Sequence, residues 1–238
     1  TMLSNKARAI SSSPTLAIDA KFKQMKANGE DVVGFGCGEP DFDTPQYIKD
    51  AAIAAINSGK TKYTPAAGTL ELRKAVAEKF KRENGLDYEP TDIVISNGAK
   101  HSLMNALTAI LNPGDEVIIP APFWVSYPEL IKLADGIPVI INTKEENEFK
   151  AKAEDLRRAL TPKTKAIILN SPSNPTGMVY TKEELKEIAD FAVENNLYVI
   201  SDEIYEHLIY EGEHISIASL SPEMRERTIT INGFSKAY

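Results

Sequence analysis

Two segments, AIILNSPSNPTG (residues 166–177) and LYVISDEIY (residues 197–205), decide the fold, since each is a short apolar run that ends in polar residues. A helical pattern at residues 182–195 separates them, and Thr181 with Glu184 three residues later forms a capping box at its start. A strand, a helix and a second strand in this order form a βαβ unit with parallel strands. Because polar residues at the carboxyl ends of parallel strands commonly form sites, we expect a site there.

The same alternation of apolar runs and helical patterns continues outward over the chain from about residue 45. It predicts an α/β fold, namely a mainly parallel sheet with helices on both faces. The predicted strands are residues 93–96, 116–119, 138–141, 166–170, 197–201 and 228–231. The predicted helices are residues 45–58, 69–84, 100–111, 124–134, 153–160 and 182–195.

Residues 1–40 follow a different pattern. They contain the polar stretch SSSP at 11–14, a helical pattern near residues 18–27, and then VVGFGCGEP. We expect them to form an N-terminal arm and part of a second, smaller domain.

Composition and charge exclude several functional classes. The net charge of -7 argues against nucleic-acid binding as the main activity. The single cysteine, Cys37, cannot form an internal disulfide, and no run approaches the roughly 20 apolar residues that span a membrane. The N-terminal residues lack the apolar core of a signal peptide. We therefore expect a cytoplasmic protein that binds neither nucleic acid nor membrane, and we expect no metal site.

The segment NGFSKAY, residues 232–238, places an amine just after a strand-like apolar run. Taken alone, Lys236 would be an ordinary surface lysine whose stem lies along apolar neighbours. Polar residues follow three further strand-like runs in the same way, in NGAK (97–100), SPSNPTG (171–177) and SDEIY (201–205). Together, the four segments predict one pocket around Lys236.

A lysine that binds an aromatic aldehyde cofactor needs a carboxylate that faces the ring nitrogen of the cofactor and an anion site for its phosphate. Asp202 follows a buried-type run, so its carboxylate would be desolvated and would need a cation such as a protonated pyridine. The alternative is that Asp202 only caps a turn. Gly98 and Ala99 open a helix whose free N–H groups suit phosphate, and the hydroxyl of Ser235 could join them.

The same cofactor needs donors to its phenolic oxygen and a flat surface against its ring. Asn174, held between two prolines, and the hydroxyl of Tyr205 are candidate donors, although Asn174 could instead close its own turn. Trp124 could stack on the ring or fill the core. Tyr63 lies in a loop that contains Gly and Pro, where its phenol could reach a neighbour or pack locally.

Seven stretches resemble the class I pyridoxal-phosphate aminotransferases, in particular the aspartate aminotransferase group, which also includes prephenate aminotransferases. They occur in the family's order and cover almost the whole chain: GEPDFDTP, KYTPAAG, NGAKHSL, PGDEVIIPAPFWVSYPE, NSPSNPTG, SDEIYEHLIYEGEH and NGFSKAY. The resemblance implies an α/β fold of the aspartate aminotransferase type, with a seven-stranded-type sheet, and pyridoxal 5′-phosphate as the cofactor.

The resemblance also implies a role for each candidate residue. Lys236 would bind the cofactor covalently and then move a proton, Asp202 would pair with the pyridine nitrogen, and Tyr205 would contact the phenolic oxygen. The remaining cofactor contacts would come from Gly98, Ala99, Lys100, Trp124, Asn174, Ser235 and, from the other subunit of a homodimer, Tyr63. Substrate contacts would come from Gly38, Lys100, Trp124 and Asn174, and Lys100 favours a dicarboxylic amino acid.

By the same resemblance, the enzyme would transfer the amino group of aspartate, or a similar amino acid, to the 2-oxo acid 2-oxoglutarate. The alternatives are prephenate or aromatic transamination, β-elimination, and a non-catalytic chain that keeps the cofactor pocket. The family continues beyond the lysine through two arginines that bind the phosphate and the substrate carboxylate, and this sequence lacks both. We therefore expect a fragment with little or no activity, in which residues 41–238 form the cofactor-binding large domain without the C-terminal small domain.

Overall fold

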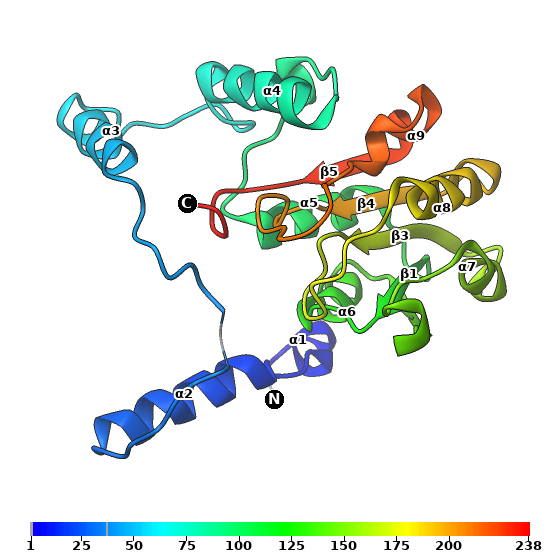
Figure 1. Cartoon of the computed structure of the whole chain (residues 1–238), viewed down its shortest axis with the longest axis horizontal. Coiled ribbons are helices and arrows are strands. Elements are labelled where there is room, and N and C mark those ends of the chain that lie inside the picture. Colours follow the sequence, from blue (N-terminus) through cyan, green and yellow to red (C-terminus); the bar gives the residue numbers. More distant parts are fainter. Residues whose placement is uncertain (1, 37) are drawn as a thin grey trace.

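The computed structural model describes residues 2–36 and 38–238 (Figure 1). Its centre is a parallel sheet of five strands in the order β2-β1-β3-β4-β5. The strands are β1 (Glu116–Ala121), β2 (Ile137–Asn142), β3 (Thr164–Asn170), β4 (Tyr198–Asp202) and β5 (Thr228–Ile231). The predicted α/β fold is confirmed, although the described residues form fewer strands than the seven that the resemblance implied.

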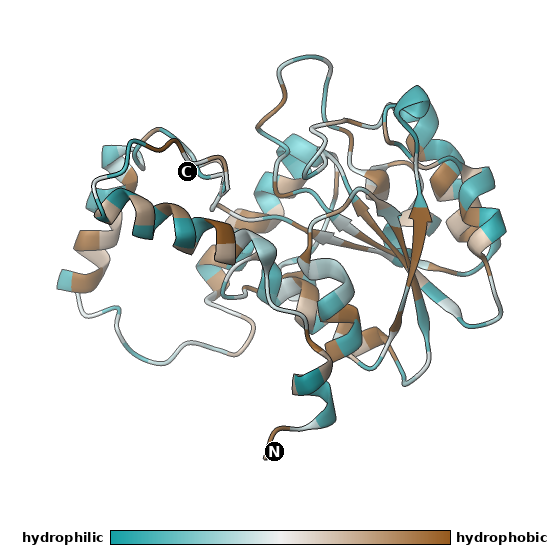
Figure 2. Cartoon of the chain, turned by 90° about the horizontal axis from the view of Figure 1, so that it is seen from below, coloured by the Kyte–Doolittle hydropathy of each residue, from teal (hydrophilic) through white to brown (hydrophobic). Residues whose placement is uncertain are grey.

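Helices cover both faces of the sheet. One face carries α5 (Ala99–Ile110) and α6 (Ser126–Leu133), and the other carries α7 (Ala153–Ala159), α8 (Lys182–Glu194) and α9 (Pro222–Arg227). Successive residues of β1 point to opposite faces, so Ile118 packs in the cluster of α8 while Val117 and Ile119 pack in the cluster of α5. Figure 2 shows hydrophobic strands enclosed by helices whose outer faces are hydrophilic. Burial on both faces is typical of parallel sheets.

Capping residues mark both ends of one long helix and the start of α8. In α4 (Leu70–Asn84), the hydroxyl of Thr69 accepts a hydrogen bond from the N–H of Leu72, and Gly85 ends the helix with a left-handed φ of 67°. The capping box predicted for α8 is confirmed, because Thr181 and Glu184 exchange side-chain hydrogen bonds with each other's N–H groups. Buried residues of α4 belong to a third cluster, which contains Ala77, Phe80, Leu86, Ile93 and Ala218.

The N-terminal helices lie at the margin of the molecule (Figure 1). The first, α1 (Asn5–Ala9), lies on α6, where Lys6 forms an ion pair of 2.7 Å with Asp135. The next two, α2 (Pro14–Ala27) and α3 (Gln46–Asn57), contain no buried residue and extend away from the sheet. The domain boundary expected near residue 41 stays a prediction.

Several short elements were not predicted. They are α1, α9 and the 3₁₀ helices η1 (Pro90–Asp92), η2 (Glu145–Asn147) and η3 (Ile217–Ser219). The start of α9 carries a recognisable signal, because Ser221 caps the helix and Pro222 occupies its first turn. Among the described helices, none has the length and apolar character needed to cross a membrane.

The strand predicted at residues 93–96 is wrong. Val94 is 61% exposed, and the N–H of Ile95 donates to the carbonyl of Ala67 rather than to a strand of the sheet. An apolar run becomes a strand only where a neighbouring strand takes up its backbone hydrogen bonds, and the described residues place no strand there. This segment is instead the connection that leads into α5.

Ile167→Ala is expected to lower the free energy of unfolding by about 2–5 kcal/mol, because Ile167 is fully buried on the central strand β3 and its truncation leaves a cavity. The matched control is Ile140→Ala on the edge strand β2, where the side chain is 49% exposed and the loss should stay below about 1 kcal/mol. Urea denaturation measures both values. Equal losses would contradict the central position of β3.

Candidate active site

The polar residues identified in the sequence lie at the carboxyl edge of the sheet. β3 ends at Asn170, β4 ends at Asp202, and the segment with Lys236 follows β5. The register sets Asn170 opposite Asp202 and Asp202 opposite Ile231. Helix α5 packs against β4 and β5. Parallel strands bring these ends to one edge, as the sequence predicted.

Asp202 is buried, with 3% of its surface exposed. The hydroxyl of Tyr127 donates to Oδ2 of Asp202 at 2.7 Å, and the N–H of Ile204 donates to Oδ1 at 3.3 Å. No ion pair to Asp202 occurs within residues 2–36 and 38–238. Burial raises the pKa of the carboxyl, and these two hydrogen bonds oppose the rise without cancelling it. The hydrogen bond from Ile204 also makes Asp202 a turn cap, but it uses only Oδ1, so capping is not the only role of this carboxylate.

Tyr127 was not identified from the sequence, although it lies three residues after Trp124. Its side chain is buried, and burial raises the pKa of its hydroxyl well above the ordinary value, with the charge of Asp202 as the second cause. The phenol therefore stays a hydrogen-bond donor to Asp202. Spacing of three residues on a helix places two side chains on the same face, and this was the available signal.

Asn170 joins Asp202 to the loop that follows β3. Its Nδ2 donates to the carbonyl of Asp202 at 2.9 Å, and its Oδ1 accepts from the N–H of Asn174 at 2.7 Å. Nδ2 of Asn174 then donates to the hydroxyl oxygen of Tyr205 at 3.2 Å. The side chain of Asn174 therefore reaches Tyr205 rather than closing its own turn. Asn170 was also missed, and its position as the last residue of a predicted strand was the signal.

The amine of Lys236 lies beside this pair. Its Nζ is 5.8 Å from the ring centroid of Tyr205, and it donates to the carbonyl of Gly38 at 3.4 Å. No carboxylate within the described part of the chain forms an ion pair with it. Gly38 and Lys236, far apart in the sequence, are thus in contact, and the amine of Lys236 lies beside Tyr205.

Trp124 and Lys100 form the other side of the site. Nζ of Lys100 lies 4.8 Å from the ring centroid of Trp124, within the range of a cation–π contact. The Trp124 ring meets Tyr127 edge to face, with centroids 5.5 Å apart. Trp124 is partly buried against the cluster of α5 and α6, so it contributes to the core as well. These contacts connect Lys100 to Asp202 through Trp124 and Tyr127.

The N-terminus of α5 carries Gly98 at the N-cap and Ala99 as the first helical residue. Gly98 has a φ of 85°, which favours glycine, and no side chain caps the helix. The space around Gly98 is open, because a Cβ placed there would meet no atom within 4 Å. Free N–H groups and the positive end of the helix dipole in open space fit a phosphate-sized anion.

Two of the predicted site residues, Ser235 and Tyr63, take no part in these contacts. Ser235 is exposed in the turn before Lys236, and no described residue forms a hydrogen bond with its hydroxyl. Tyr63 is fully exposed, so the interpretation that its ring packs locally in its own loop is wrong. Its predicted contact with another subunit stays untested.

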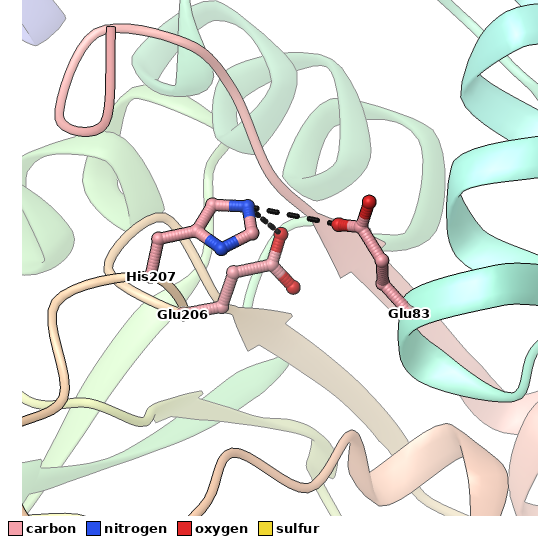
Figure 3. A group of neighbouring side chains, drawn as sticks. All are labelled: Glu83, Glu206 and His207. Atoms are coloured by element: carbon pink, nitrogen blue, oxygen red, sulfur yellow. Dashed lines mark ion pairs between the residues drawn. The ribbon is translucent and has the colours of Figure 1, made fainter.

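Two groups of acidic and histidine side chains lie close enough to share a cation. They are Glu83, Glu206 and His207 (Figure 3), and Glu203, Glu206 and His214. The ammonium of Lys79 already pairs with Glu206 and lies 3.6 Å from Glu83. The cation position of the first group is therefore filled by a side chain of the protein.

Comparisons with known proteins identify the family of the chain. The family model described as "Aminotransferase class I and II" matches residues 30–238. An aspartate aminotransferase of Bacillus sp. (strain YM-2) is 57% identical over 100% of this chain and 61% of the relative. A probable aspartate/prephenate aminotransferase of Aquifex aeolicus is 51% identical over 99% of this chain and 60% of the relative.

A solved structure of the aspartate aminotransferase from Thermus thermophilus with maleate superposes with a TM-score of 0.97 at 50% sequence identity. The match covers 100% of this chain and 62% of that protein, so the chain spans about three fifths of the length of its relatives. Since the family match extends over most of the sequence, the chain belongs to the class I and II aminotransferase family.

Proposed function

We propose that the chain is the cofactor-binding part of a pyridoxal-phosphate-dependent aminotransferase that transfers the amino group of aspartate, or a similar amino acid, to 2-oxoglutarate. The observation that carries this proposal is the buried carboxylate of Asp202, which has no cation partner in the described residues. It shares one edge of the sheet with the amine of Lys236, which has no carboxylate partner there. A ring that carries both a protonated pyridine nitrogen and an aldehyde would satisfy the two groups, the nitrogen at Asp202 and the aldehyde at Lys236.

The residues present fit the proposed cofactor. Asp202 would hold the pyridine nitrogen, and Asn174 with Tyr205 would hold the phenolic oxygen, since their side chains already converge at 3.2 Å. The open N-terminus of α5 at Gly98 and Ala99 would hold the phosphate. The further contacts proposed on this cofactor are those of Ser235, of Trp124 against the ring, and of Tyr63 from a second copy in a homodimer.

When bound, pyridoxal phosphate supplies an electron sink that stabilises negative charge at the substrate Cα. The chain supplies the other parts of the reaction. Asp202, oriented by Tyr127, keeps the ring nitrogen protonated. The amine of Lys236 has no carboxylate partner among the described residues, which leaves it able to bond to the cofactor and to move the proton at Cα. Tyr205 and Asn174 orient the phenolic oxygen.

The substrate proposal rests on Lys100 and Gly38. The ammonium of Lys100, stacked on Trp124, would face the distal carboxylate of a dicarboxylic substrate, and Gly38 beside Lys236 would lie at its α-carboxylate.

Relatives named aspartate/prephenate aminotransferase support prephenate as a second acceptor. Because the chain spans about three fifths of its relatives, we propose turnover for the longer protein. There, oxaloacetate and glutamate formed from aspartate and 2-oxoglutarate would distinguish transamination from β-elimination.

Lys236→Ala is expected to abolish the visible absorption band that forms when pyridoxal phosphate is added to the chain, because the variant lacks the amine that bonds to the aldehyde. Lys165→Ala is the matched control: Lys165 is partly buried and lies 5.6 Å from the ring centroid of Tyr198, but at the opposite edge of the sheet. Absorption spectra, with mass spectrometry after borohydride reduction, measure the adduct. A band that persists in Lys236→Ala would remove Lys236 from its role.

Asp202→Asn is expected to weaken the binding of pyridoxal phosphate by about 10- to 100-fold, because a charge-assisted hydrogen bond to the ring nitrogen is lost. Fluorescence titration measures the dissociation constant. Asp190→Asn, in an exposed ion pair with Lys186 on α8, controls for the loss of one surface charge and should bind as the wild type does. Equal affinities for all three proteins would refute the contact between Asp202 and the cofactor.

The cofactor-free chain should also show the cost of burying Asp202. Its pKa is raised above the ordinary value of 3.8 in the folded state, so the folded state holds this proton more tightly than the unfolded state does. The contribution of Asp202 to the free energy of unfolding therefore falls as the pH rises from about 3.8 through the raised pKa. Over that window, the free energy of unfolding measured by urea denaturation should fall more in the wild type than in Asp202→Asn. A constant difference across the window would contradict the raised pKa.

A further inference from the structure

We propose that Glu203 is a positioning residue of the site. Its buried carboxylate fixes the far end of the loop of residues 204–216 to the end of β4. The loop carries Tyr205, and the end of β4 carries Asp202. This inference rests on the proposed function of the pocket. Glu203 makes none of the contacts proposed for the cofactor.

Glu203 is almost completely buried, with 1% of its surface exposed. Its Oε1 accepts hydrogen bonds from the hydroxyls of Ser201 and Ser216, both at 2.8 Å. Its Oε2 lies 2.8 Å from Nε2 of His214. Ser201 belongs to β4, whereas His214 and Ser216 belong to the returning end of the loop. One carboxylate thus joins the strand to a segment more than ten residues away.

The backbone of Glu203 is fixed as well, because its N–H donates to the carbonyl of Ile231 at 2.8 Å. Asp202 and Glu203 are consecutive, and their carboxylates reach opposite surroundings: Tyr127 of α6 for Asp202, and the returning loop for Glu203. A shift of the loop would therefore act directly on the backbone at the end of β4, which orients Asp202.

A second buried carboxylate, Glu206, anchors the same loop just after Tyr205 in the sequence. Glu206 pairs with Lys79 and accepts from Nδ2 of Asn84 at 2.7 Å, which ties it to α4. Figure 3 shows Nε2 of His207 facing both Glu206, at 3.4 Å, and Glu83 of that helix, at 3.7 Å. Residues before and after Tyr205 in the sequence are thus anchored, and Tyr205 itself contacts Asn174 and lies beside the amine of Lys236.

Removal of part of this clamp should loosen the loop without removing any group that contacts the cofactor. A buried carboxylate that loses a donor keeps its desolvation cost, so the loop would shift to restore a partner. The negative charge of Glu203 also raises the pKa of Asp202, as a smaller cause after burial. Both effects act on the proposed cofactor pocket through neighbouring residues.

The test compares Ser216→Ala with Ser219→Ala in the full chain. Each variant loses one hydrogen bond of similar length in the same short helix or its cap, but the hydroxyl of Ser219 donates to the carbonyl of Ser216 and does not reach Glu203. Ser216→Ala is expected to speed amide hydrogen exchange in residues 204–216 without cofactor and to weaken pyridoxal phosphate binding by about tenfold. Ser219→Ala is expected to bind like the wild type.

Glu203→Gln and Glu203→Ala form a second comparison. Gln keeps the length and two hydrogen-bonding atoms of the side chain, so it should retain much of the affinity and the absorption maximum of the bound cofactor, whereas Ala should lose both. If Glu203 only stabilises the fold, the variants would differ in their unfolding midpoints and agree in affinity and absorption maximum, which would overturn the proposal.

The two proposals fail in different ways. If the wild type forms no adduct with pyridoxal phosphate, the proposed function is wrong, while hydrogen exchange in the cofactor-free chain still decides whether Glu203 holds the loop. If the wild type forms the adduct and Ser216→Ala matches Ser219→Ala in both exchange and affinity, the clamp is wrong and the proposed function stands.

Discussion

The parallel pairing of β3 with β4, in the register that sets Asn170 opposite Asp202, is the constraint on which the site depends. The amide of Asn170 reinforces this register by bonding to the carbonyl of Asp202. Side chains alternate between the two faces of a sheet, so a slip by one residue would turn Asp202 away from Tyr127. The same slip would move Asn174 away from Tyr205, because Asn170 also holds the N–H of Asn174. The pairing of two apolar strands therefore sets the chemistry at their ends.

Asp202 and Glu206 are both buried carboxylates, but they differ in whether a cation of the protein balances their charge. Burial raises the pKa of Glu206, but hydrogen bonds from Lys79 and Asn84 outweigh it, and the net pKa lies below the ordinary value. Asp202 receives no such cation among the described residues, and its net pKa is raised. Glu206 is therefore satisfied by the protein, whereas Asp202 remains a group whose charge a bound cation would stabilise.

Local sequence signals predicted most of the fold. The βαβ unit from β3 to β4 and the capping box of α8 follow from apolar runs and from Thr181 with Glu184, which act within a few residues. The error at residues 93–96 has a different origin, because strand formation depends on a distant partner that periodicity does not reveal. The burial of Asp202 could also be predicted from the sequence, because the apolar run before it indicated a desolvated carboxylate.

The site was predicted as a set of segments rather than as a set of contacts. Asp202, Asn174 and Tyr205 are connected through Asn170, and the amine of Lys236 lies beside Tyr205. Tyr127 and Asn170 were missed, because a tyrosine in an apolar helix and an asparagine at a strand end look ordinary until their partners are known. The contact of Gly38 with Lys236 joins residues separated by almost the whole chain, which no local pattern indicates.

The absence of buried residues in α2 and α3 has a thermodynamic consequence. Helices of this length are marginal in water by themselves, and packing against a core supplies most helical stability in folded proteins. In the chain as given, we therefore expect the sheet and its covering helices to melt as a unit, and these two helices to fray independently of it. We expect a protease cut between α2 and α3 to leave the sheet folded. The cut would, however, loosen the segment that contains Gly38, whose carbonyl is the one hydrogen-bonded to the amine of Lys236 in the described residues.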